Sequence, residues 1–205
     1  DIFYYITLYN ENYAMPAMPK GAEDGILKGL YLFKKAPAEL KLRAQILGSG
    51  PLIRSALRAQ ELLAERYQVG ADVWSATSFQ QLRVEALSTD RWTRLHPEET
   101  PRVPYVTRVL EKSKGPIVAV TDHLKSVPGQ IRGFVRTPYT TLGTDGFGRS
   151  DTREALRAHF EIDAESVVVA TLHALAREGK IEQHVVARAI KDVGIDPEKL
   201  DPLLA

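Results

Sequence analysis

Short apolar runs of β type alternate in this chain with longer stretches whose apolar residues recur at helical spacing. The β-type runs are 42–47, 71–76, 116–121 and 139–142. The stretches between them that we expect to be helical are 51–68, a short helix after 77–78, a segment from 102–105 to about 114–115, and 127–135. With short glycine turns, this alternation predicts an α/β fold: a doubly wound, mainly parallel sheet with helices on both faces.

A glycine-rich run, Gly143–Glu154, follows the last β-type run and leads into a helical C-terminal end. Its glycines permit positive φ angles and close approach of another backbone or a ligand. Ser150 or Asp151 is expected to cap the next helix, with Asp151 and Glu154 at capping-box spacing. Two interpretations stay open: a well-capped turn without a ligand, or an anion-holding or interface turn formed by Asp145, Gly146, Phe147 and Gly148. The helices expected after it are 151–160, 163–178 and 181–193.

The N-terminal region differs from the alternating part. Ile2–Leu8 is rich in aromatic and β-branched residues, which is typical of a buried strand. A strand at the start lacks partners, which indicates a piece of a longer chain. A helix over 23–33 and a connector over 34–41 are expected next. We therefore expect residues 1–40 to be the tail of a preceding domain with a connector, and residues 41–205 to be a separate domain.

Composition excludes several classes of protein. Lys and Arg number 27 against 26 Asp and Glu, a net charge of +1 in 205 residues, so neither nucleic acid nor an acidic membrane surface is an expected partner. The chain has no cysteine, which excludes disulfides and thiolate metal sites. No apolar run approaches the roughly 18 to 20 residues that span a bilayer, and the first residues lack the basic leader and cleavage site of a signal peptide, so neither a membrane span nor a signal peptide is expected in this sequence.

Four stretches carry a resemblance to a known family: Asn10–Pro19, Leu47–Gly50, Leu95–Tyr105 and the glycine run. In their order, they resemble the C-terminal end of the homodimeric bacterial type of pyruvate dehydrogenase, the thiamine diphosphate-dependent decarboxylating component of the pyruvate dehydrogenase complex. The turn Leu47–Gly50 occurs in any doubly wound fold. The proline-rich stretches and the glycine run are long and specific.

The resemblance implies a transketolase-type C-terminal domain with one antiparallel strand, preceded by the end of a middle, pyrimidine-binding domain. It also implies a cytoplasmic homodimer that decarboxylates pyruvate with thiamine diphosphate and Mg²⁺ and acetylates a lipoyl group of the acyltransferase component. The family's Gly-Asp-Gly…Asn motif for the diphosphate and Mg²⁺ is missing here, and so is its activating glutamate. We therefore expect this chain to hold no catalytic residue, no cofactor and no metal ion, and to support the dimer and the channel rim.

The polar loop Asn10, Glu11, Asn12 and Tyr13 is the candidate functional segment. It follows the first β-type run and precedes two prolines, and its polar groups are ill-suited to a core. By the resemblance, it lines the rim of the channel used by pyruvate or the lipoyl arm. The alternative is that the loop merely caps a domain boundary.

Other reactive side chains give weaker patterns. The histidines, which lack the spacing of a metal pair with a third ligand, are His96, His123, His159, His173 and His184. Asp122 and His123 follow a β-type run, where open sheets place functional groups, and form either a dyad or a solvated loop pair. Ser49 lies in a Gly-Ser-Gly turn that lacks the Gly-x-Ser-x-Gly pattern of a nucleophile elbow.

Two other functions compete with the pyruvate dehydrogenase interpretation. One is the C-terminal domain of another thiamine diphosphate enzyme of the transketolase type, against which the proline-rich stretches count. The other is a free-standing α/β binding or regulatory module. The sequence upstream of this chain would separate all three.

Overall fold

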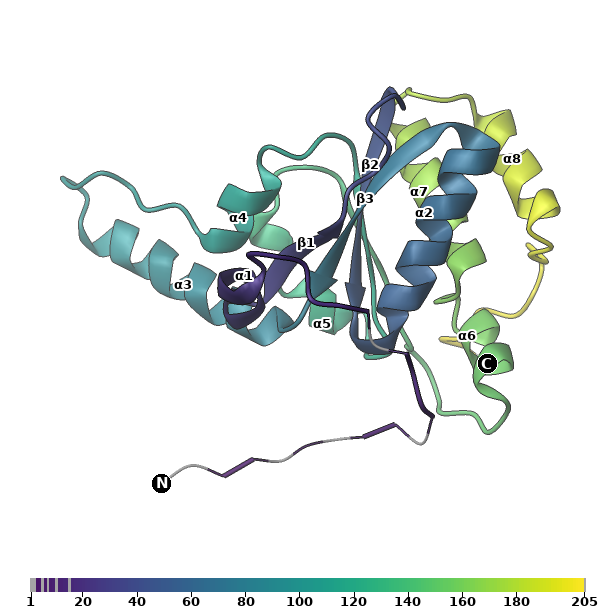
Figure 1. Ribbon diagram of the computed structural model, residues 1–205, viewed down its shortest axis with the longest axis horizontal. Coiled ribbons are helices and arrows are strands. Elements are labelled where there is room, and N and C mark those ends of the chain that lie inside the picture. The colour runs from purple at the N-terminus through teal and green to yellow at the C-terminus, as the bar shows by residue number, and fades with distance from the viewer. Residues whose placement is uncertain (1–2, 5, 7, 10, 15, 205) are drawn as a thin grey trace.

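The computed structural model describes residues 3–4, 6, 8–9, 11–14 and 16–204. Within them lies one five-stranded sheet of order β1-β3-β2-β4-β5, with helices on both faces (Figure 1). The strands are β1 (Leu30–Lys34), β2 (Leu42–Ser49), β3 (Val69–Ala76), β4 (Ile117–Val120) and β5 (Tyr139–Leu142). Strands β2 to β5 run parallel, and β1 pairs antiparallel with β3. The predicted doubly wound, mainly parallel sheet is confirmed.

Two layers of helices enclose the sheet. One face is covered by α2 (Ile53–Tyr67), α7 (Ala164–Arg177) and α8 (Gln183–Asp192). The other is covered by α3 (Phe79–Leu95), α4 (Tyr105–Leu110) and α5 (Ser126–Gly129). Successive residues of a strand point to opposite faces, so Ile46 of β2 enters the α2 and α7 core while Leu47 enters the α3 and α4 core. Burial on both faces explains why β2, β3 and β4 are rich in apolar residues, whereas the edge strand β5 is only half-buried.

The region before β2 differs from the prediction. The expected helix over 23–33 is instead a short helix, α1 (Glu23–Lys28), followed by β1. Gly29 separates them because its φ is 98° and a Cβ there would lie 2.5 Å from the Ser78 carbonyl oxygen. Only glycine tolerates both conditions, so the helix ends and the chain turns into the sheet.

Three predicted helices also differ in length or start. The helix after Ser78 is not short: α3 has 17 residues, and the Ser78 hydroxyl caps it by accepting from the Gln81 amide at 3.0 Å. The segment 127–135 forms only α5 and a 3₁₀ turn, η2 (Arg132–Phe134), because proline and glycines interrupt it. The helix α6 (Arg153–His159) is capped by the Thr152 hydroxyl rather than by Ser150 or Asp151.

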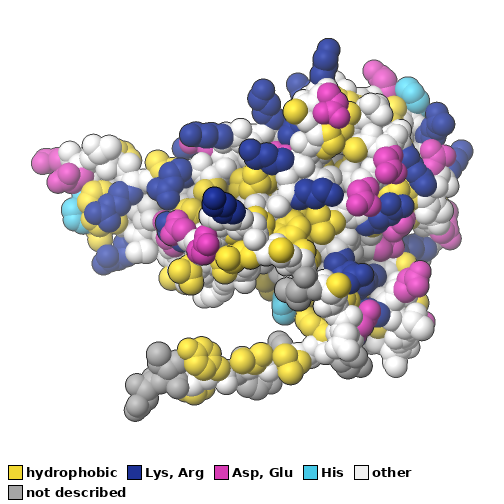
Figure 2. All heavy atoms as spheres, in the orientation of Figure 1, with side chains coloured by type: hydrophobic (Ala, Val, Ile, Leu, Met, Phe, Trp, Pro, Cys, Tyr) yellow, Lys and Arg dark blue, Asp and Glu magenta, His cyan; other side chains and the backbone are white. Residues whose placement is uncertain are grey.

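The described residues of the N-terminal segment form no strand. Phe3, Tyr4 and Leu8 are 93%, 81% and 88% exposed, and Figure 2 shows yellow side chains along this segment, which stands clear of the body. The prediction of a buried strand is therefore wrong for these residues, because no strand of this sheet pairs with them. Ile2, Tyr5 and Thr7 lie outside the described residues.

Candidate functional site

The carboxyl ends of β2 and β4 mark the place where a ligand would bind in a sheet of this order. The chain leaves β2 for β3 on one side and later returns to β4 on the other side of β2. At such a switch point the loops after neighbouring strands diverge and leave a crevice. The loops that meet here are 48–50, 121–125 and 143–145, and Thr144 joins two of them by donating from its hydroxyl to the Asp122 carbonyl at 2.9 Å.

The N-terminal segment reaches this edge through Tyr9. Its hydroxyl donates a hydrogen bond to the Asp122 carboxylate, and a Cβ added at Gly50 would lie 3.7 Å from that hydroxyl oxygen. Partial burial, and then the hydrogen bond to Asp122, raise the pKa of Tyr9 to about 12. The phenol therefore stays protonated near neutral pH and anchors the segment at the switch point.

The predicted polar loop follows this anchor and contacts α6. The Arg153 Nε lies 2.6 Å from a Glu11 carboxylate oxygen, and the Tyr13 hydroxyl donates to Glu11 at 2.8 Å. The Arg157 guanidinium donates to the Tyr13 hydroxyl at 2.9 Å, and the Arg54 guanidinium of α2 lies 5.3 Å from the Tyr13 ring centroid. Arg153 and Arg157 are four residues apart and so share one face of α6.

Of the other two residues of the predicted rim, only Asn12 is described, and no contact of its side chain joins this network. Asn12 is exposed, and Asn10 lies outside the described residues. The loop borders a surface hollow of about 760 Å³ between α2, α6 and the start of α7. Its charged lining residues balance in sign and are Glu11, Arg54, Arg58, Arg153, Glu154, Arg157, Asp163, Glu165, Asp196 and Lys199.

The glycine turn is approached by the chain's own backbone. Gly146 has a φ of 102°, and a Cβ there would lie 2.1 Å from the Pro202 carbonyl oxygen. Asp145 accepts from the Lys125 amide at 2.8 Å. Phe147 is 80% exposed, and a Cβ at Gly148 would meet open space. Asp145 and Gly146 thus serve local packing, whereas Phe147 and Gly148 face outward, and the interface role stays a prediction.

The side chains of Asp122 and His123 do not form a hydrogen-bonded dyad. The Asp122 carboxylate receives the Tyr9 hydroxyl, while His123 is exposed and its amide donates to the Thr121 hydroxyl at 3.2 Å. Among the described residues, no group of three or more His, Asp or Glu side chains could hold a metal ion. None of the described helices is long and apolar enough to cross a membrane.

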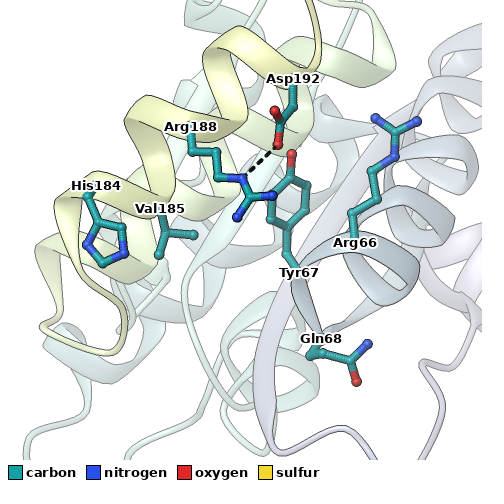
Figure 3. Close-up of a pocket in the computed structure, with 7 residues that line it drawn as sticks. All are labelled: Arg66, Tyr67, Gln68, His184, Val185, Arg188 and Asp192. Atoms are coloured by element: carbon teal, nitrogen blue, oxygen red, sulfur yellow. Dashed lines mark ion pairs between the residues drawn. The ribbon is translucent and has the colours of Figure 1, made fainter.

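A second hollow, of about 540 Å³, lies at the far end of α2 from the switch point (Figure 3). Arg188 and Asp192 of α8 form an ion pair of 3.4 Å beside Tyr67. Burial, and then the charge of Asp192, raise the pKa of Tyr67. Arg66 and His184 also line this hollow. No sequence pattern marked it, because its residues come from two helices that are far apart in the chain.

The sheet order and the switch point at the carboxyl ends of β2 and β4 are those of a known class of domain. The family model described as "Transketolase-like TK C-terminal domain" matches residues 29–163, and the chain belongs to this family. The transketolase from Leishmania mexicana has the same fold, with a TM-score of 0.51 and 20% sequence identity over 75% of this chain and 19% of that chain.

More similar sequences share one name, "Pyruvate dehydrogenase E1 component". The protein of Pseudomonas aeruginosa is 52% identical over 99% of this chain, and that of Escherichia coli K12 is 50% identical over 100%. The Mycobacterium tuberculosis protein is 46% identical over 96% of the chain. The chain spans 23% of the length of the first two relatives and 21% of the third. The resemblance predicted from the motifs is confirmed.

Proposed function

We propose that this chain is the C-terminal part of a pyruvate dehydrogenase E1 component. The parent would oxidatively decarboxylate pyruvate on thiamine diphosphate and transfer the acetyl group to a lipoyl group of the acyltransferase component. It would act as a cytoplasmic homodimer within a multienzyme complex. The observation that carries the proposal is sequence identity of 52% along 99% of the chain to a protein with that name.

The residues of this chain do not fit the cofactor. Thiamine diphosphate is held through a Mg²⁺ ion on its diphosphate, and no acidic or histidine cluster for a metal occurs among the described residues. The sequence also lacks the Gly-Asp-Gly…Asn motif. We therefore propose that other parts of the parent bind the cofactor and carry out its chemistry.

We propose that the domain begins before α1 rather than at residue 41. Strand β1 belongs to the sheet, and the Thr77 hydroxyl donates to the Ile26 carbonyl at 2.8 Å, which fixes α1 against the end of β3. The family match begins at residue 29. Residues 1–22 are then the connection from the middle, pyrimidine-binding domain.

We propose that Glu11, Asn12 and Tyr13, with Asn10, line the rim of the channel that leads to the cofactor. The support is the position of the described loop residues, which belong to this connection, follow the Tyr9–Asp122 contact at the switch point and are held against α6. Charged groups at that position are suited to orienting a macromolecular substrate, whereas the chemistry would take place deeper in the channel.

The test is carried out in the full-length enzyme. Glu11→Ala and Asn12→Ala should lower turnover with the lipoyl domain on the order of tenfold, and more than decarboxylation with an artificial electron acceptor, because a positioning group affects the step that uses its substrate. Glu65→Ala, at an exposed position of α2, is the control. Equal losses in both assays would place the loop in the decarboxylation site. No loss in either would leave it as a cap on a domain boundary.

A further inference from the structure

We propose that Arg153, Arg157 and Arg54 form an arginine clamp that fixes the loop 9–13, which makes them positioning residues for the channel rim. The existence of the clamp stands on the contacts of this chain alone. Its consequence for lipoyl turnover rests on the proposed function. The clamp would give the C-terminal domain a part in the reaction although it holds no cofactor.

The contacts form a closed path that starts and ends on α6. Arg153 binds the Glu11 carboxylate at 2.6 Å, Glu11 accepts from the Tyr13 hydroxyl at 2.8 Å, and that hydroxyl accepts from Arg157 at 2.9 Å. Hydrogen bonds with an ionised donor or acceptor are about twice as strong as neutral ones. Because one turn of α6 separates the two arginines, the path fixes both the position and the orientation of the loop.

Aromatic contacts support the same geometry. The Arg54 and Arg157 guanidinium groups lie 5.3 Å and 5.9 Å from the Tyr13 ring centroid, and Arg153 lies 5.8 Å from that of Tyr9. The Tyr9 and Tyr13 rings meet edge to face at 6.2 Å. Cations within about 6 Å of an aromatic face are attracted to it. The clamp therefore holds the tyrosines through their rings as well as through the Tyr13 hydroxyl.

The platform of the clamp is helix α6, which carries Arg153 and Arg157 and is itself fixed to the rest of the domain. Leu156 of α6 packs against the core, and the Thr152 hydroxyl caps the first turn. At the other end, Lys199 donates to the Ala158 carbonyl at 2.8 Å and to the His159 carbonyl at 3.2 Å. The described loop residues belong to no helix or strand, so side-chain contacts with this platform and with Asp122 hold the loop.

Chymotryptic cleavage of the 205-residue chain tests the clamp directly. Cleavage after Tyr13 requires the loop to open, whereas Phe147 is 80% exposed and its cleavage serves as an internal reference. Arg157→Gln removes the charged donor and should raise the rate of cleavage after Tyr13, relative to Phe147, roughly fivefold, because cleavage follows the open population. Arg58→Gln is the matched control, since Arg58 lines the same hollow but pairs with Glu61 of its own helix at 3.1 Å.

A conservative variant and a pair of charge reversals separate the clamp from a general loss of structure. Arg157→Lys keeps the charge and a donor and should restore most of the protection. Glu11→Arg and Arg153→Glu should each raise cleavage after Tyr13, and their combination should bring it back toward the value of the unmodified chain. Unchanged cleavage in Arg157→Gln, or equal cleavage in Arg58→Gln, would overturn the clamp.

Activity of the full-length enzyme then tests the consequence. Arg157→Gln should raise the KM for the lipoyl domain several-fold and affect acceptor-linked decarboxylation less, with rescue by Arg157→Lys. If cleavage after Tyr13 rises but lipoyl turnover does not change, the clamp stands and the proposed rim function fails. If cleavage does not rise, the clamp fails whatever the activities are.

Discussion

At the scale of single residues, one buried polar side chain of β2 links that strand to β3 and to the segment that precedes β4. Gln45 is fully buried on β2, and its amide donates to the Lys114 carbonyl at 2.9 Å. The Trp74 indole of β3 donates to the Gln45 side-chain oxygen at 2.8 Å. A buried amide is tolerated only when its donors and acceptors are paired, and here both are. Gln45 thus stabilises the β2–β3 pair through side chains as well as through the backbone.

We therefore expect Gln45→Leu to destabilise the chain by about 1 to 3 kcal/mol, because the Trp74 indole N–H would stay buried without a partner and the Lys114 carbonyl would lose its donor. The free energy of unfolding in urea, followed by tryptophan fluorescence, measures the change. Gln80→Leu on the exposed side of α3 is the control, with an expected effect within about 0.5 kcal/mol. Adding Trp74→Phe to Gln45→Leu should recover part of the loss, since it removes the orphaned donor. Equal stability of the two single variants would contradict this account.

At the scale of elements, the parallel strands could be predicted from sequence and the N-terminal elements could not. Strands β2, β3 and β4 are largely buried on both faces, so apolar runs mark them without any knowledge of their partners. Strand β1 also has a short apolar run, Leu30–Phe33, but this run continues the helical spacing of 23–33, and its pairing partner β3 lies some forty residues away. The loop 10–13 was recognisable from its polar character. Its partner Arg157 was not, since 144 residues separate it from Tyr13.

Within the glycine run, the structure predicts that substitution by alanine destabilises the chain at Gly146 but not at Gly148. Gly146→Ala combines a left-handed φ of 102° with a clash against the Pro202 carbonyl and should destabilise the chain by more than about 1 kcal/mol. Gly148→Ala enters open space at a φ that is not positive and should change stability by less than about 0.5 kcal/mol. Thermal denaturation compares them. A similar loss in both variants would show that flexibility of the run, rather than its packing on the C-terminal segment, matters.

At the scale of the whole molecule, the chain has two parts with different packing. Residues from α1 to the C-terminal segment share one sheet and its two cores. The described residues before Pro16 contact that body through a few side chains, of which Tyr9, Glu11 and Tyr13 carry the contacts. The chain thus contains one folded domain and an N-terminal segment that a few side chains hold against it. Removal of the N-terminal segment should therefore lower the stability of the chain less than removal of part of the sheet.

We expect a chain that starts at Ala22 to keep its fold, and a chain that starts at Lys41 to lose stability and to self-associate. The first deletion removes the loop and its surface contacts, and each exposed ion pair contributes about 1 kcal/mol or less. The second also removes β1, whose Leu30 is fully buried, and exposes the edge of β3 together with its unpaired backbone groups. The loss of Leu30 alone should cost about 2 to 5 kcal/mol, on the scale of large-to-small core substitutions.

Thermal denaturation and sedimentation velocity compare both shortened chains with the 205-residue chain, and Leu30→Ala in the 205-residue chain separates lost packing from an exposed edge. A stable, monomeric chain from Lys41 onward would restore the boundary expected from the sequence, whereas an unfolded chain from Ala22 onward would make the N-terminal segment part of the domain.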